Sequence, residues 1–167
     1  ANVAGDKTPR EFESLPFRTL NFLFRKSERW SYMNHKSMKT ILVDAVYAFV
    51  VETENGFEIF EPMRKMLDEF PNTKIILTGA DDEQFKKFGL AGMPYEVFTL
   101  KHHPEKTDSA YYEKMLDHFG LNKDAVVYFE HDERAVKSAR SVGIMTYHYD
   151  NDRKDLGALR GFLVENM

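Results

Sequence analysis

The chain has 167 residues, of which 43% are hydrophobic and 14% aromatic, so it can bury one sizeable core and favours a single domain. It contains no cysteine, which excludes disulfides, cysteine-ligated zinc, iron–sulfur clusters and thiol catalysis, and favours the reducing cytoplasm. The net charge of −4 gives no electrostatic reason to expect a nucleic-acid partner. Apolar runs such as residues 45–51 are too short to cross a bilayer, and no signal-peptide pattern opens the chain, so we expect a soluble protein without a membrane partner.

The first 37 residues differ in charge from the rest of the chain. They carry seven Lys/Arg and four Asp/Glu, a net charge of +3, whereas residues 38–167 carry −7. Apolar residues recur at helical spacing between Phe17 and Phe24, and Ser14 before Pro16 is typical of a helix start. We expect an N-terminal amphipathic helix that docks on the domain or mediates homo-oligomer contacts. Foreign sequence from an expression vector and an Arg-containing targeting peptide are the alternatives.

The main segment, residues 38–167, begins with a strand and a hairpin. Thr40–Val43 is a short β-branched apolar run typical of a buried parallel strand, and it stops at Asp44. Residues 47–60 contain Asn55-Gly56 between apolar residues, which predicts a small β-hairpin. Pro62 is typical of the first turn of a helix, which we expect to end before residue 71.

The remaining segments alternate between strand and helix patterns. Strands are predicted at 74–77, 95–100, 125–129 and 144–149, and helices at 81–88, 108–119, 133–142 and 156–164. Strands that alternate with helices on right-handed crossovers form a doubly wound parallel α/β sheet with helices on both faces.

Polar residues follow several of these strands, at the edge of the sheet where ligands bind in such folds. We interpret Asp44 as a nucleophile, Thr78 with Gly79 as a phosphoryl-binding turn, and Lys106 as the cation that neutralises the phosphoryl charge. Glu130 or Asp132, together with Asp44, would provide a hard oxygen site suited to Mg²⁺. His131, His102 and His103 show no ligand spacing for zinc, and we expect them on the surface or in loops.

The order of these segments resembles the four motifs of the haloacid dehalogenase-like (HAD) superfamily. The matching stretches are Ile41–Asp44, Leu77–Gly79, Lys106–Asp108 and Tyr128–Asp132, and the resemblance covers roughly residues 38–167. It implies a Rossmann-like HAD core in which the hairpin is the family's flap. The segments between the motifs are too short for a cap domain, so the resemblance is to capless members. It also implies that the backbone carbonyl of Val46 is a Mg²⁺ ligand.

Two motifs depart from the family pattern. Phosphatases of the family carry a second aspartate two residues after the nucleophile as general acid and base, followed by Gly and Thr, whereas this chain has Val46, Tyr47 and Ala48. Loss of a positioned acid or base costs about 10²- to 10⁴-fold in rate. The fourth motif has Glu130-His131 where the family usually has Gly-Asp or Asp-Asp.

Three functional hypotheses remain open from the sequence. The first is a phosphatase-like HAD hydrolase that uses Asp44 and Mg²⁺ on a small phosphorylated or other acidic substrate. The second is a catalytically inactive HAD-like binding or scaffolding module, which Val46 favours. The third is a dehalogenase-like hydrolase that needs Asp44 but no metal.

Overall fold

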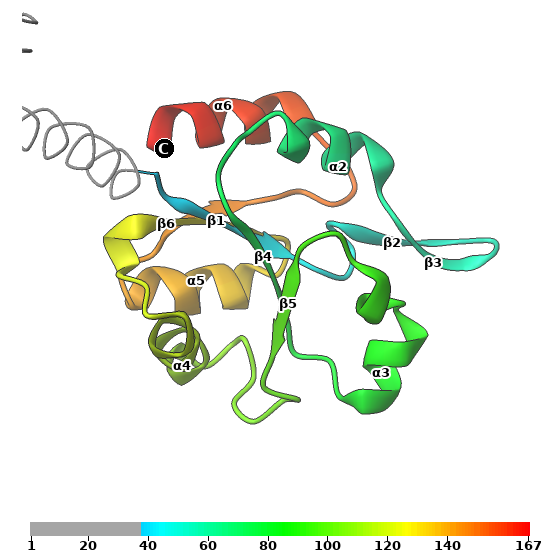
Figure 1. The fold of residues 1–167 in the computed structure, drawn as a ribbon, viewed down its shortest axis with the longest axis horizontal. Coiled ribbons are helices and arrows are strands. Elements are labelled where there is room, and N and C mark those ends of the chain that lie inside the picture. The colour runs from blue at the N-terminus through cyan, green and yellow to red at the C-terminus, as the bar shows by residue number, and fades with distance from the viewer. Residues whose placement is uncertain (1–37) are drawn as a thin grey trace, which may run out of the picture. The chain divides into compact units, whose positions relative to one another are not determined.

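The computed structural model of the protein describes residues 38–167. Five parallel strands form one sheet in the order β5-β4-β1-β6-β7 (Figure 1). Their bounds are β1 Thr40–Asp44, β4 Lys74–Thr78, β5 Glu96–Thr99, β6 Val126–Glu130 and β7 Met145–His148. β1 lies in the middle, paired in parallel with β4 on one side and with β6 on the other. The doubly wound parallel sheet predicted from the sequence is confirmed.

The predicted hairpin follows β1. It consists of β2 (Val50–Thr53) and β3 (Gly56–Ile59), which pair antiparallel as a separate two-stranded sheet. Gly56 has φ +111°, a backbone conformation that glycine adopts without steric cost. No additional domain interrupts the fold between β1 and β4, because the chain passes directly from the hairpin into a helix.

Helices cover both faces of the sheet (Figure 1). α2 (Glu61–Asp68) and α6 (Leu156–Asn166) pack on one face, where Leu67 and Leu159 are buried in the same core as Val43 of β1. α4 (Ser109–Phe119) and α5 (Glu133–Ser141) pack on the opposite face, in a second core that includes Leu42. Successive residues of β1 therefore point to opposite cores, as the pleat of a strand requires.

Local sequence signals explain where several helices begin and end. Asp81 accepts hydrogen bonds from two backbone amides at the start of α3 (Asp82–Lys87), and Asp108 accepts from Ala110 N at 2.9 Å at the start of α4. Gly120 ends α4 with φ +60°, the left-handed conformation that favours glycine. The helix predicted to run nearly to residue 71 ends instead at Asp68, since the chain closes in a tighter turn there.

Short 3₁₀ turns at Leu90–Gly92 and Lys123–Ala125 complete the described part of the chain. Within residues 38–167, no helix is long and apolar enough to cross a membrane. The predicted N-terminal helix and its proposed contacts lie outside the described residues.

Candidate functional site

The site lies where the chain reverses its direction of growth across the sheet. From β1 the chain builds outward through β4 to β5, and it then returns to the other side of β1 to form β6 and β7. Asp44 ends β1 and Glu130 ends β6, so the two carboxylates stand at the carboxyl ends of adjacent strands. Their residues are 1% and 0% exposed. Such a switch point is where ligands bind in open α/β sheets.

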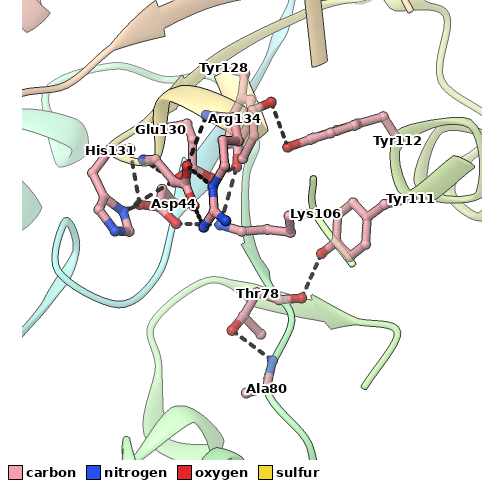
Figure 2. A network of polar contacts seen from close by, with 12 residues as sticks. Asp44, Thr78, Ala80, Lys106, Tyr111, Tyr112, Tyr128, Glu130, His131 and Arg134 are labelled. Atoms are coloured by element: carbon pink, nitrogen blue, oxygen red, sulfur yellow. Dashed lines mark hydrogen bonds and ion pairs between the residues drawn. The ribbon is translucent and has the colours of Figure 1, made fainter. Parts of the chain in front are cut away.

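Lys106 connects the two carboxylates. It lies in the segment that precedes α4, and its Nζ is 2.5 Å from Asp44 Oδ1 and 2.6 Å from Glu130 Oε2 (Figure 2). The side chain is only 16% exposed. Burial works against the ammonium charge, but Asp44 and Glu130 outweigh that effect and raise the pKa of Lys106 well above its ordinary value. Lys106 is therefore cationic at neutral pH, and its ammonium group is held against Asp44.

Protein donors surround the carboxylate of Glu130. Oε2 accepts from Lys106 and from the hydroxyl of Tyr128, the residue two positions earlier on β6. Oε1 accepts from the backbone N–H of Asp132 at 2.9 Å and lies 3.1 Å from Nδ1 of His131. A carboxylate offers about four lone-pair sites. Three of them accept hydrogen bonds, and His131 adds an ion-pair contact, so Glu130 anchors the charged groups around it.

His131 closes the site on the other side of Asp44. Its Nδ1 lies 2.5 Å from Asp44 Oδ2, and its side chain is 25% exposed (Figure 2). Burial opposes the imidazolium charge, but the Asp44 and Glu130 carboxylates, which accept from the ring N–H, raise the pKa of His131 to about 10. The ring is thus cationic at neutral pH, and two positive side chains balance two buried carboxylates.

The two carboxylates differ in how readily they ionise. Burial raises the pKa of Asp44, and the negative charge of Glu130 raises it further, while Lys106 and His131 act in the opposite direction. Burial also disfavours the charge on Glu130, but Lys106, His131 and Tyr128 together hold its pKa below the ordinary value. Two neighbouring buried carboxylates separate in this way because the ionisation of one disfavours that of the other. Glu130 carries the more stable charge of the pair.

A cluster that suits a metal ion is formed by Asp44, Glu130 and His131. Each contributes one ligand atom, and these atoms lie within 4.8 Å of one another. Two carboxylates are hard oxygen ligands of the kind that Mg²⁺ prefers, so this donor set fits that ion. However, His131 Nδ1 contacts Asp44 Oδ2 and Glu130 Oε1 at once. The imidazole and a cation would compete for the same two oxygens.

Asp132 lies beside the cluster without joining it. Its carboxylate caps α5 by accepting from Arg134 N at 2.8 Å, and it also pairs with the Arg134 guanidinium at 2.7 Å. The hydrogen bond and charge of Arg134 lower the pKa of Asp132. Of the two metal ligands that the sequence left open in this motif, the geometry brings Glu130 to Asp44, and it engages Asp132 at the helix start.

Thr78 and Gly79 follow β4 at the same edge of the sheet. The residue Thr78 is 4% exposed, and its Oγ1 accepts from Ala80 N at 3.2 Å. A hydroxyl that accepts in this way keeps its O–H free to act as a donor. The backbone carbonyl of Thr78 accepts from the Tyr111 hydroxyl of α4 at 2.7 Å (Figure 2). A Cβ on Gly79 would stand 3.3 Å from the ring of His102, which leaves little room for a larger residue.

These residues line a pocket of about 530 Å³. Asp44, Thr78 and Lys106 contribute its polar part, and the apolar lining includes Val46, Tyr47 and Phe88. This volume is in the range of small-molecule sites. Gln84, His102, Glu105 and Arg134 also line it. Val46 thus faces the same pocket as Asp44, but its side chain cannot transfer a proton.

Sequence reasoning missed two members of the site. It placed His131 among surface or loop histidines, and it read Tyr128 only as part of a buried strand. The signal for His131 was its position directly after Glu130, since the residue that follows a strand end lies at the same edge of the sheet. For Tyr128 the signal was strand periodicity: residues two apart face the same side, which puts its hydroxyl near the carboxylate of Glu130.

Comparisons with known proteins identify the fold. The structure resembles a HAD family enzyme from Bacteroides thetaiotaomicron in its magnesium complex, with a TM-score of 0.58 and 10% identity over 73% of this chain and 98% of that chain. It also resembles a HAD-superfamily hydrolase of subfamily IA from Geobacter sulfurreducens, with a TM-score of 0.53 and 13% identity over 68% of this chain and 90% of that chain. No protein-family model and no curated protein sequence matches the chain. The chain therefore has a HAD-like fold.

Proposed function

We propose that the protein hydrolyses phosphate monoesters through a covalent intermediate on Asp44. One observation carries the proposal: a nearly fully buried carboxylate stands at the switch point of the sheet, faces a pocket of about 530 Å³ and is held by Lys106 at 2.5 Å. Burying a carboxylate costs free energy, so a role in function explains the position of Asp44 better than a role in stability does. The HAD-like fold supports the same function.

In this proposal a carboxylate oxygen of Asp44 attacks phosphorus, and the bond from phosphorus to the ester oxygen breaks. Lys106 and the O–H of Thr78 stabilise the charge on the phosphoryl oxygens during the attack. Water then attacks the aspartyl phosphate, releases inorganic phosphate and restores the carboxylate of Asp44. Val46 offers no proton to the departing oxygen, so that oxygen leaves with its electron pair and is protonated by solvent.

Mg²⁺ fits this chemistry as the partner of the two carboxylates. Asp44, Glu130 and the backbone carbonyl of Val46 are the groups that would hold it, and Asp132 is not needed. The ion would supply additional positive charge against the transferring phosphoryl group. Lys106 remains in place as the resident cation, whereas His131 leaves the two oxygens that it now contacts.

A binding module without catalytic activity is the second candidate. Two observations favour it: Val46 replaces the acid or base, and Glu130 already accepts three hydrogen bonds from protein donors and pairs with His131. In that case the pocket would still bind an acidic ligand, and Asp44 would serve to position Lys106.

Hydrolysis of an aryl phosphate by the purified chain, beside Asp44→Asn and with or without Mg²⁺, separates these functions. The proposal predicts turnover that requires both Asp44 and Mg²⁺. Turnover that requires Asp44 alone would favour the metal-independent hydrolase. Equal rates for the wild type and Asp44→Asn on a panel of aryl and alkyl phosphates would contradict both hydrolase functions and favour the binding module.

A further inference from the structure

The residue three positions after Asp44 has an unusual backbone conformation. Tyr47 has φ +68°, the left-handed region that glycine adopts freely and that a bulky side chain enters only at a cost in free energy. Three backbone hydrogen bonds of the turn hold Tyr47 in this conformation. Tyr47 N donates to Val50 O at 2.7 Å, Val50 N donates to Ala45 O at 2.8 Å, and Phe49 N donates to Asp44 O at 3.2 Å.

Packing does not compensate for this strain. Tyr47 is 47% exposed, so its ring gains much less from burial than a core aromatic does. The ring nevertheless lines the pocket that holds Asp44 and Lys106. Backbone strain of this kind clusters at ligand-binding sites, and here it carries an exposed aromatic ring that lines a pocket.

The ring is held in place by other aromatic side chains. It meets the His131 ring edge-on at 5.7 Å between centroids and the Phe57 ring at 6.5 Å. Phe57 in turn packs edge-to-face on Phe88 of the pocket lining at 4.7 Å. Because the Phe57 and Phe88 support is independent of the carboxylates, Tyr47 presents a pre-oriented apolar surface beside the candidate nucleophile even when His131 moves. Such a surface binds a flat aromatic ring with little further loss of entropy.

The chemistry at Val46 leads independently to the same kind of ligand. Since the pocket residue two positions after Asp44 has no proton to give, ester oxygens that leave readily as anions are favoured. Phenol oxygens leave more readily than those of alkyl alcohols, because their conjugate acids are much stronger. We propose that the pocket selects phosphate monoesters of phenols, with Tyr47 as the residue that recognises their ring.

This inference rests on the proposed function, because it places the phosphoryl group at Asp44, Thr78 and Lys106. In the transfer, the bond from an Asp44 oxygen to phosphorus forms as the bond from phosphorus to the phenol oxygen breaks. The phenolate departs with the electron pair and takes its proton from solvent. Water then hydrolyses the aspartyl phosphate, which releases inorganic phosphate and restores Asp44, and no oxidant or reductant is needed.

Binding of two non-hydrolysable phosphonates tests the inference without requiring turnover. Phenylphosphonate and methylphosphonate are titrated calorimetrically, with Mg²⁺ present, into the full chain, Tyr47→Phe and Tyr47→Asn. Phe keeps the ring and the strain, whereas Asn tolerates the left-handed backbone and lacks the ring. We expect the wild type and Tyr47→Phe to bind phenylphosphonate about tenfold more tightly than methylphosphonate, in line with the strength of aromatic contacts.

Tyr47→Asn should remove this preference and melt no lower than the wild type, because it relieves the turn. A preference for phenylphosphonate that survives in Tyr47→Asn would overturn the role of the ring. Equal binding of both phosphonates to the wild type would overturn the aromatic selectivity and leave the phosphoryl site standing. Failure of either phosphonate to bind any variant would overturn the phosphoryl site itself, and the inference with it.

Discussion

Removing the ammonium of Lys106 tests the charge arrangement of the site most sharply. Its Nζ makes ion pairs of 2.5 and 2.6 Å with two carboxylates whose side chains are 1% and 0% exposed. Breaking a buried pair by deleting one partner costs about 3–5 kcal/mol, because the remaining charge stays buried without its partner. Lys106→Met preserves most of the side-chain volume while it removes the charge, so we expect a loss of that size.

A loss of this size is large against the total stability of about 5–15 kcal/mol for a typical domain. It corresponds to a fall in melting temperature of about 10–20 °C for a folded unit of this length. Urea unfolding followed by circular dichroism measures the free energy directly. The matched control is Lys101→Met, since Lys101 pairs with Asp82 at 2.7 Å but has a side chain that is 55% exposed. Such surface pairs contribute about 0–1 kcal/mol.

The double variant Lys106→Met/Glu130→Gln distinguishes lost charge pairing from a general packing defect. Neutralising Glu130 removes one of the two carboxylates that lose the ammonium of Lys106, so the double variant should be more stable than the sum of the single effects predicts. The reasoning about buried charge is wrong if the free energies of unfolding of Lys106→Met and Lys101→Met agree within about 1 kcal/mol. It is also wrong if the loss in the double variant equals the sum of the two single losses.

Three further predictions follow from the same contacts. Val46→Asp should raise kcat on alkyl phosphates by about 10²- to 10⁴-fold, because it supplies an acid and base. Val46→Asn, whose side chain has the shape of Asp but cannot transfer a proton, should not raise kcat. Equal rates for the two variants would contradict this prediction. His131→Ala should tighten Mg²⁺ binding, measured by calorimetry, by about tenfold or more, since a hydrogen bond from a charged donor no longer competes; unchanged or weaker affinity would refute the competition. Asp44→Asn should melt no lower than the wild type at neutral pH, because burial and the charge of Glu130 raise the pKa of Asp44, so that its ionisation costs stability in the folded state. The stability that the protonated form contributes is present at low pH and is lost as the pH rises through the raised pKa. A lower melting temperature would show that ion pairing at Asp44 outweighs burial.

The main lines of the fold were predictable because the signals are local. Thr40–Val43 is an apolar run that stops at a charge, Asn55-Gly56 marks a turn, and Asp108 with Gly120 brackets a helix. Each signal acts through the backbone of a few neighbouring residues, and the structure confirms the strand, hairpin and helix at these places.

The partners of the site residues were less predictable, because they depend on tertiary distance. Strand ends brought Asp44 and Glu130 to one edge by topology alone, and Lys106 followed from its place before a helix. The direction of the His131 ring depends on its contact with Asp44, 87 positions away, and the ion pair of Glu130 with Lys106 spans 24 positions. No local pattern encodes such contacts. Asp132 had two equally local interpretations, metal ligand and helix cap, and only its contact with Arg134 distinguishes them.

The left-handed backbone at Tyr47 was also beyond the sequence. A tyrosine in a turn gives no sign of positive φ, since its usual conformations are extended or right-handed. The conformation arises from the hydrogen bonds that close the turn between β1 and β2. Residues that break a local preference in this way concentrate at functional sites.

The measurement that tests the central claim most directly is detection of the covalent intermediate. The chain is mixed with an aryl phosphate and Mg²⁺, quenched in acid during turnover, digested and analysed by mass spectrometry. The account predicts a single phosphoryl adduct on the peptide that contains Asp44, which is absent from Asp44→Asn and disappears when the substrate is exhausted. Turnover without any adduct at Asp44, or an adduct on another residue, would contradict it.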